Sequence, residues 1–351
     1  MHDYPDFSKL PTALGPNIKV DGRFYPYFGG TAYLGIPQHK MFISLYQEGI
    51  GLYGLTNGTS RSNNVQLGIY EEVEAYAARK FGAAAALMVS SGFLAAQLAV
   101  KQFAKFGQVR HAPETHPALW LDEPPTSKGS FEQWAKAIVE EINESSVKQW
   151  LLISNSMNNL FPEIYDFSFL SEISKDKQVI LLVDDSHGIG INNGGLGALS
   201  TIQAPQQVKV LVVASMGKAL GIDAGIIMGD DKLVGKIKNS NAFFGASPPA
   251  AAGLHAFMKG EKYYAQERNR LGMLTERLGK ALQHDPNWHF IPEFPVFLSK
   301  NADLSKSLLE KQILISAFPY PDKDGDLVNR IVLSSWHSME DIDTLIRALT
   351  K

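Results

Sequence analysis

Short runs of apolar residues recur along the chain and limit the folds that it can adopt. They are rich in Val, Ile and Leu and do not alternate with polar residues, which is typical of strands buried on both faces of a parallel sheet. Five runs have this character: residues 86–89, 150–153, 179–183, 208–213 and 224–228. The stretches between them are long enough for crossover helices, so the sequence predicts an α/β fold with a mostly parallel sheet.

The pattern changes after residue 250. A polar helical stretch over residues 261–283 leads to scattered strands and to a final helix over residues 339–349, where Ser338 and Asp341 predict a capping box. These elements predict a smaller α+β domain. We therefore expect an N-terminal segment over residues 1–40, a large domain over 41–250 and a small C-terminal domain over 251–351.

Two further elements can be predicted nearer the N-terminus. Residues 17–28 have the pattern of a β-hairpin with Asp21 and Gly22 as its turn. Residues 70–81 predict a helix, because their apolar residues share one face and Gly82 follows where helices commonly end.

Composition excludes several classes of function. The 351 residues carry a formal net charge of -3, so there is no basic excess for gripping nucleic acid. The chain has no cysteine, which excludes disulfides and cysteine-ligated metals, and we expect no metal site. No apolar run approaches the roughly 18 residues that a membrane span needs, and the first ten residues do not resemble a signal peptide. We expect a cytoplasmic protein without a membrane or nucleic-acid partner.

The most informative motif is VILLVDDSHGIG, residues 179–190, in which a buried strand delivers polar side chains to its carboxyl end. Asp184, Asp185, Ser186 and His187 follow the apolar residues directly. Ligands bind at this edge in open parallel sheets, and a charge next to pure hydrocarbon is costly unless it has a partner. The alternative is a structural turn in which Asp and Ser cap the next element.

A lysine follows another of the predicted strands in the segment VVASMGKALG, residues 212–221. Lys218 lies three residues after Ser215, between small residues, as a Schiff-base lysine does. An exposed lysine at a helix start is the alternative. A nucleotide P-loop is excluded by its pattern, because Val212 and Ala219 stand where that motif needs Gly and Ser or Thr.

A third predicted strand, in the segment MVSSGFLAA, ends in a serine-containing turn before a helix of small residues. Ser90, Ser91, Gly92 and Phe93 stand at the expected N-terminus of that helix, where hydroxyls and amides can bind a phosphate. A serine N-cap without any ligand is the alternative.

The three motifs together predict one cofactor. Pyridoxal 5'-phosphate (PLP) chemistry needs a lysine for a Schiff base, an acid beside the pyridine nitrogen and a phosphate site at a helix N-terminus. Lys218, Asp184 and the turn at Ser91 supply these groups, each at the end of a predicted parallel strand. We therefore expect a PLP enzyme whose cofactor is attached to Lys218.

The chain resembles the α-oxoamine synthases, which are fold-type I PLP enzymes of the aspartate aminotransferase superfamily. The likeness covers nearly the whole chain. It is carried by VDDSHGIGINNGGLGAL (183–199) and VVASMGKALG (212–221), and also by VDGRFYPYFGGTAYLG (20–35) and RIVLSSWHSMEDID (330–343). The resemblance implies a PLP-like large domain with a smaller C-terminal domain, and an acyltransferase that condenses an amino acid with an acyl-CoA, similar to 8-amino-7-oxononanoate synthase.

The resemblance also implies roles for individual residues. Lys218 would hold PLP and move the proton at the substrate's α-carbon, while Asp184 would pair with the pyridine nitrogen. His187 would hydrogen-bond the ring's phenolic oxygen. His116 would stack on the ring, with His111 as its rival. The other residues implied are Ser156 at the phenolic oxygen, Ser91, Gly92, Phe93 and Ser215 at the phosphate, and Arg330 at the substrate carboxylate.

Several positions depart from the pattern of that family. Thr31 and Phe318 stand where the family has asparagine and, often, arginine, and the N-terminal extension is short. Phe244 and Gly245 replace the hydroxyl residues of a loop that reaches the partner subunit's phosphate site. The apolar, proline-containing segment over residues 243–251 still predicts a homodimer, with fewer cross-subunit phosphate contacts than in the family.

Three other functions compete with this interpretation. A relative that has lost acyl-CoA binding would catalyse another PLP reaction, of the aminotransferase, lyase or aldolase type, and would form a keto acid without a thioester. Nicotinamide binding is a weaker alternative, because the glycines of HGIGINNGGLG follow the acids instead of preceding them. A non-catalytic binding protein is disfavoured by the intact Asp184, His187 and Lys218.

Overall fold

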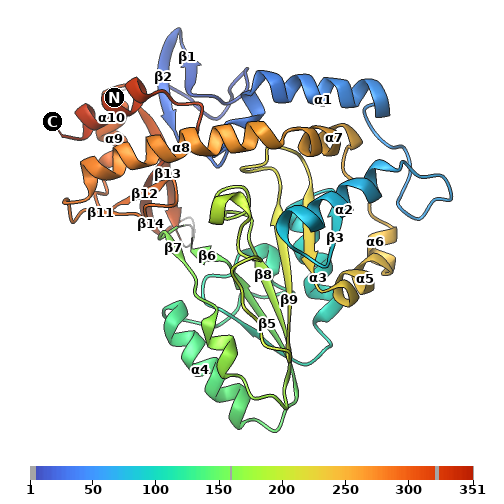
Figure 1. Ribbon diagram of the computed structural model, residues 1–351. Helices are drawn as coiled ribbons and strands as arrows, with labels where there is room; N and C mark the ends of the chain where they lie inside the picture. The colour runs from blue at the N-terminus through green and yellow to red at the C-terminus, as the bar shows by residue number, and fades with distance from the viewer. Residues whose placement is uncertain (1–4, 159, 321–323, 351) are drawn as a thin grey trace. The chain divides into compact units, whose positions relative to one another are not determined.

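The computed structural model describes residues 5–158, 160–320 and 324–350. The described residues form two compact units (Figure 1). The larger unit takes Lys40–Asn158 and Ile164–Glu261, and the smaller one takes the described residues of Met1–His39, Asn159–Glu163 and Lys262–Lys351. The domain limits expected at residues 40 and 250 stay a prediction.

The main strands of the larger unit form one sheet. They are β3 (Ala85–Val89), β4 (Gln108–His111), β5 (Gln149–Asn155), β8 (Gln178–Asp184), β9 (Val208–Ser215) and β10 (Gly225–Gly229). Their spatial order is β3-β10-β9-β8-β5-β4. The pairs β4–β5, β5–β8 and β8–β9 are parallel, whereas β10 runs antiparallel to β3 and β9. The predicted α/β fold with a mostly parallel sheet is therefore confirmed.

The direction of β10 corrects one expectation. The apolar run at residues 224–228 was expected to be a parallel strand like the others, and that prediction is wrong. Only residues 216–224 connect β9 to β10, and a parallel neighbour needs a crossover of a dozen or more residues. The apolar pattern could not reveal this, because a strand buried on both faces has the same composition in either direction.

The helices of the larger unit lie before, between and after these strands in the sequence. They are α1 (Lys40–Tyr53), α2 (Ile69–Phe81), α3 (Gly92–Phe103), α4 (Phe131–Glu144), α5 (Asp231–Lys238), α6 (Asn241–Phe244) and α7 (Ala251–Lys259). α2 confirms the helix predicted over residues 70–81, and Gly82 ends it in the left-handed conformation with φ 70°. α3 buries Ala95, Ala99 and Phe103 in the core that it shares with β8, β9 and β10. This packing fixes the N-terminus of α3 near the strand ends.

The smaller unit has a sheet of its own, which is mostly antiparallel. Its strands are β1 (Asn17–Val20), β2 (Arg23–Phe28), β11 (Trp288–His289), β12 (Val296–Ser299), β13 (Leu314–Tyr320) and β14 (Asp326–Val332). Their order is β1-β2-β13-β14-β12-β11, with β2 and β13 parallel. The predicted hairpin is confirmed, since β1 and β2 pair antiparallel and both turn residues have positive φ, 50° at Asp21 and 77° at Gly22.

The helices near the C-terminus are α8 (Glu261–Leu282), α9 (Leu304–Glu310) and α10 (Met339–Leu349). Two of them, α8 and α10, confirm those predicted over residues 261–283 and 339–349, whereas α9 was not predicted. Two short strands, β6 (Met157–Asn158) and β7 (Glu163–Ile164), pair with each other outside the two main sheets. The predicted capping box of α10 is confirmed: Asp341 N donates to Ser338 Oγ at 3.1 Å, and Ser338 N donates to Asp341 Oδ2 at 2.7 Å. In the described part of the chain, no helix is long and apolar enough to cross a membrane.

Candidate active site

The carboxyl ends of three parallel strands meet at one edge of the larger unit's sheet. β5, β8 and β9 are neighbours, so their ends lie side by side. The alignment continues past the strands: Ser156 N donates to Asp184 O at 2.8 Å, and Asp185 N donates to Val213 O at 2.8 Å. This edge therefore carries Ser156, Asp184 and the segment that begins after Ser215.

The turn before α3 joins the same edge through two close approaches of the backbone. Gly225, the first residue of β10, pairs with Val89 on one side and with Ser215 on the other. A Cβ atom on Gly92 would lie 2.5 Å from Ser215 Cβ, and one on Gly225 would lie 2.1 Å from Ser91 O. Both distances are far below van der Waals contact, so only glycine lets the N-terminus of α3 come this close to the end of β9.

The N-terminus of α3 has the geometry of an anion site. Ser91 is the N-cap, and its Oγ accepts a hydrogen bond from Leu94 N at 3.1 Å. The amides of Gly92 and Phe93 belong to the first turn, where the helix supplies no carbonyl partner. Ser91 thus has the capping role that its position allowed, while the phosphate role expected for Ser91, Gly92, Phe93 and Ser215 stays a prediction.

Lys218 lies beside the histidine of the acidic motif. Lys218 Nζ and His187 Nε2 are 2.8 Å apart, which is hydrogen-bond range. Asp184 Oδ1 accepts a hydrogen bond from Ser186 N at 2.9 Å, and Ser186 Oγ accepts one from Ser215 N at 2.8 Å. These contacts join the segment after β8 to the segment after β9, and they bring the acid, the histidine and the lysine to one place.

His116 joins this group from the segment after β4. Its backbone N donates to Asn155 Oδ1 at 3.2 Å, and its Nδ1 accepts from Ala118 N at 3.1 Å, so Nε2 carries the proton in the neutral ring. His116 is exposed by surface area, but partial desolvation of its ring lowers its pKa. The negative charge of Asp184 raises the pKa of His116, and the positive charge of Lys218 lowers it. His116 therefore lies within electrostatic range of both charged groups.

His111, the rival of His116, makes structural contacts instead. Its Nε2 lies 3.2 Å from Leu119 O, and its backbone O accepts a hydrogen bond from Ser127 Oγ at 2.6 Å. Burial lowers the pKa of His111. These contacts favour His116 as the histidine of the site.

Ser156 presents a buried hydroxyl just after β5. The residue is 4% exposed, and within the described residues its Oγ has no hydrogen-bond partner. Leaving a buried hydroxyl without a partner costs about 1–3 kcal/mol. The buried hydroxyl of Ser156 is therefore available to a bound group or to a neighbouring proton donor.

Arg330, the residue expected to bind the substrate carboxylate, belongs to the smaller unit. On β14 it pairs with Leu298 of β12 and with Ser316 of β13. Its side chain is buried, and its Cζ lies 5.1 Å from the ring centroid of Phe318, a cation–π distance. Phe318 is one of the positions that depart from the family pattern, and it packs on this arginine. The contact with the substrate carboxylate stays a prediction.

Sequence reasoning missed two residues that build the site. Asn155 holds the loop of His116, because its Nδ2 also donates to Glu114 O at 2.7 Å. Asp185, which the motif places beside Asp184 without a role of its own, is the buried member of the pair at 1% exposure. Strand alternation predicts that the two acids point to opposite sides of the sheet, but it does not say which of them is buried. No local pattern marks Asn155.

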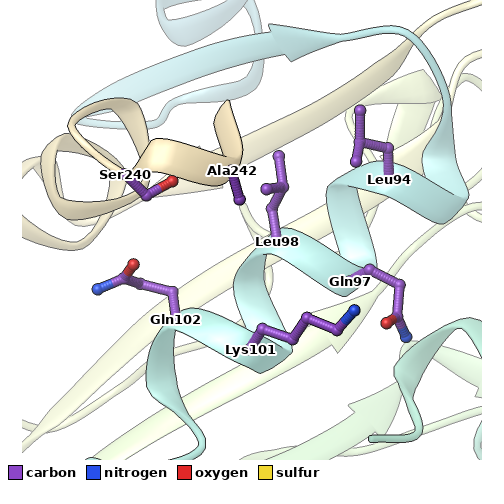
Figure 2. A pocket seen from close by; sticks show the side chains of 7 residues that line it. All are labelled: Leu94, Gln97, Leu98, Lys101, Gln102, Ser240 and Ala242. Atoms are coloured by element: carbon purple, nitrogen blue, oxygen red, sulfur yellow. The ribbon is translucent and has the colours of Figure 1, made fainter. Parts of the chain in front are cut away.

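A pocket of about 310 Å³ lies apart from this cluster, between α3 and the start of α6. Figure 2 shows that its lining includes Gln97 and Lys101 from α3, together with Ser240 and Ala242. Gln97 already donates to Ala118 O at 2.9 Å. In the described structure, none of the residues expected to bind the cofactor lines this pocket, so we assign the site to the strand ends instead.

Comparison with known proteins places the chain in a family. The family model described as aminotransferase class I and II matches residues 121–349, and the chain belongs to that family. An 8-amino-7-oxononanoate synthase from Nitrosospira multiformis is 26% identical over 361 residues, which cover 97% of this chain and 90% of that protein. One from Methylococcus capsulatus is 26% identical over 352 residues, which cover 95% of this chain and 90% of that protein. These relatives confirm the resemblance to the α-oxoamine synthases.

Solved structures confirm the fold. A serine palmitoyltransferase from S. paucimobilis with a bound PLP–myriocin aldimine has a TM-score of 0.81 at 17% identity, covering 97% of this chain and 90% of that one. An 8-amino-7-oxononanoate synthase from Francisella tularensis has a TM-score of 0.72 at 17% identity, covering 93% of this chain and 97% of that one.

Proposed function

We propose that this chain is a PLP enzyme that condenses an amino acid with an acyl thioester. The observation that carries the proposal is the cluster of Lys218, His187, Asp184 and His116 at the carboxyl edge of a parallel sheet. Ligands bind at this edge in open α/β sheets. The names of the relatives support the same class of reaction, and the family of the chain supports the use of PLP.

The residues at this edge fit PLP. The strand ends supply three groups that PLP needs. Lys218 supplies the amine for the covalent link, Asp184 the acid for the ring nitrogen, and the first turn of α3 the amides for the phosphate. The buried hydroxyl of Ser156, which has no partner among the described residues, suits an oxygen atom of the ring. The residues that would hold the cofactor are Lys218, Asp184, His187, His116, Ser156, Ser91, Gly92, Phe93 and Ser215.

The chemistry that PLP supplies when bound is the withdrawal of electrons from the α-carbon of an attached amino acid. Lys218 Nζ would move the proton at that carbon. His187, whose Nε2 lies 2.8 Å from Lys218 Nζ, would hydrogen-bond the phenolic oxygen of the ring. The carboxylate of Asp184 would keep a proton on the ring nitrogen. His116, whose pKa is lowered by desolvation, would lie against the ring without adding a charge.

Arg330 is the proposed partner of the amino-acid carboxylate. Its planar guanidinium can donate two parallel hydrogen bonds to a carboxylate, which a lysine cannot do. The ring of Phe318 lies 5.1 Å from Arg330 Cζ, so one face of the guanidinium is in contact with an aromatic ring.

The proposed reaction predicts thiol release. The PLP-loaded protein, given an acyl-CoA and glycine, alanine or serine, should release CoA only when both substrates are present. A thiol reagent can report this without background, because the chain has no cysteine. Formation of a keto acid from the amino acid, with no CoA released under any acyl donor, would contradict the proposal and support the alternative PLP reaction.

We further propose that the protein is a homodimer. In the larger unit, α1 and the segment after it carry exposed apolar side chains: Met41, Ile43, Leu52, Leu55 and Val65. Such side chains are typical of interfaces, and a two-fold dimer is the commonest closed assembly. Phe243, in the segment expected to face a partner, is 3% exposed and packs in the core, so α1 is the better candidate surface.

The proposed dimer can be tested by light scattering on the purified protein. The expected mass is twice that of the 38.6 kDa chain. Charged substitutions at Leu52 and Leu55 should shift the mass toward that of one chain, because they place charge in the proposed contact. A wild-type protein that already has the mass of one chain contradicts the proposal.

A further inference from the structure

A cluster of buried polar side chains lies at the strand end that carries Asp184. Asp185 is 1% exposed, and Ser156 and Asn192 are buried as well. Asp185 Oδ2 accepts a hydrogen bond from Ala198 N at 2.8 Å. Within the described residues, Ser156 Oγ, Asp185 Oδ1 and Asn192 Oδ1 have no hydrogen-bond partner. These three buried oxygen atoms without a hydrogen-bond partner require a physical explanation, because buried polar groups are nearly always paired.

Two glycines fix the position of the Asp185 carboxyl group. A Cβ atom on Gly188 would lie 2.2 Å from Asp185 Oδ1 and 3.2 Å from Asn192 Nδ2, and one on Gly197 would lie 2.1 Å from Asp185 Oδ2. Any side chain at either glycine would collide with the carboxyl. The backbone therefore packs directly against both oxygens and leaves the acid little freedom to turn away.

The charge state of this acid follows from its surroundings. An ionised carboxylate would need donors for both oxygens, and an unpaired buried charge is strongly unfavourable. A neutral acid instead carries a proton that Oδ1 can donate to a neighbouring oxygen. Burial raises the pKa of Asp185 to about 7, and the charge of Asp184 contributes to the increase. The Ser156 hydroxyl and the Ala198 amide act in the opposite direction and lower this pKa. The hydroxyl of Ser156 is thus close to the acid, although the two are not aligned as a hydrogen bond.

We propose that Asp185 is a positioning residue, a neutral carboxylic acid that donates its proton to Ser156 and orients that hydroxyl toward the bound cofactor. The inference rests on the proposed PLP function. The two neighbouring acids then divide the work: Asp184 carries the negative charge beside the ring nitrogen, and Asp185 contributes a hydrogen bond without a second charge. A buried carboxylic acid that stays neutral can serve as a hydrogen-bond donor in this way.

The backbone already supports this arrangement. Ser156 N donates to Asp184 O at 2.8 Å, so the main chain of Ser156 is held by β8. The side chain of Ser156 remains to be oriented, and Asp185 is the acid beside it. A hydroxyl that accepts from Asp185 keeps its own proton available for an oxygen of the ring.

Asparagine and alanine at position 185 distinguish a neutral donor from a carboxylate. Asn keeps an acceptor for Ala198 N and offers an N–H in place of the acid proton, whereas Ala removes both groups. In the purified full-length chain, Asp185→Asn should bind PLP within about threefold of wild type with an unchanged absorption spectrum, and Asp185→Ala should bind about tenfold more weakly, as expected for one lost hydrogen bond. The difference between Asn and Ala should vanish in a Ser156→Ala background.

An infrared measurement covers the case in which the alanine variant does not fold. At about pH 6, below the raised pKa, the wild type should show the carbonyl band of a protonated carboxyl group that Asp185→Asn lacks. The positioning role is overturned by a missing band, by an Asn variant as weak as Ala, by an Ala variant equal to wild type, or by a difference that persists without the Ser156 hydroxyl. A wild-type protein that binds no PLP overturns the proposed function as well.

Discussion

Replacing Lys218 with alanine is expected to lower the rate of CoA release by about three orders of magnitude or more, within the range found for removal of a general acid–base group that also binds covalently. The substitution removes the amine that would hold PLP and the group that would move the α-proton. It also removes the partner that lies 2.8 Å from His187 Nε2. The measurement is steady-state CoA release together with the absorption spectrum of the PLP-loaded variant.

A second lysine controls for nonspecific effects of this change. Lys236 is exposed on α5, so Lys236→Ala should leave both the rate and the spectrum unchanged. If Lys218→Ala retains more than about a tenth of the wild-type rate, the proposed role of Lys218 in proton transfer is wrong, because general acid–base groups contribute at least a hundredfold.

Replacing Asp184 with alanine is expected to slow exchange of the α-proton of a bound amino acid by about two to three orders of magnitude, as for the loss of one electrostatic group aimed at developing charge. Without the carboxylate, the ring nitrogen would lose its proton and withdraw electrons less strongly. PLP should still bind, because Lys218 and the N-terminus of α3 are intact. The measurement is exchange of the α-proton into deuterium oxide, followed by nuclear magnetic resonance.

The control for this variant is Asp231→Ala, which removes an exposed acid in the first turn of α5. It should leave the exchange rate unchanged. An Asp184→Ala variant that exchanges the α-proton at nearly the wild-type rate would remove the electron-withdrawing role from Asp184.

The sequence predicted the strands of the larger unit well because their apolar runs are dense and end abruptly in polar residues. The runs before Asp184 and Ser215 end where β8 and β9 end, so the apolar pattern alone places the candidate residues at one edge of the sheet. Local signals were equally reliable at the hairpin turn of Asp21 and Gly22 and at the capping box of Ser338, because each depends on neighbours in the chain.

Features that depend on distant segments could not be predicted in this way. The antiparallel direction of β10 follows from the short connection after Ser215, which the apolar pattern does not encode. The parallel pairing of β2 with β13 joins Tyr27 to Leu314 across most of the chain. The burial of Asp185 depends on close packing by Gly188 and Gly197, and no spacing rule reveals which of two adjacent acids is the buried one.

Covalent trapping of the cofactor tests the central claim most directly. The PLP-loaded protein is reduced with borohydride and digested, and the peptides are identified by mass spectrometry. We predict that the reduced cofactor is found on the peptide containing Lys218, because that amine lies beside His187 at the shared strand edge. Reduced cofactor on any other lysine, or none in fully PLP-loaded protein, would contradict the assignment of this site.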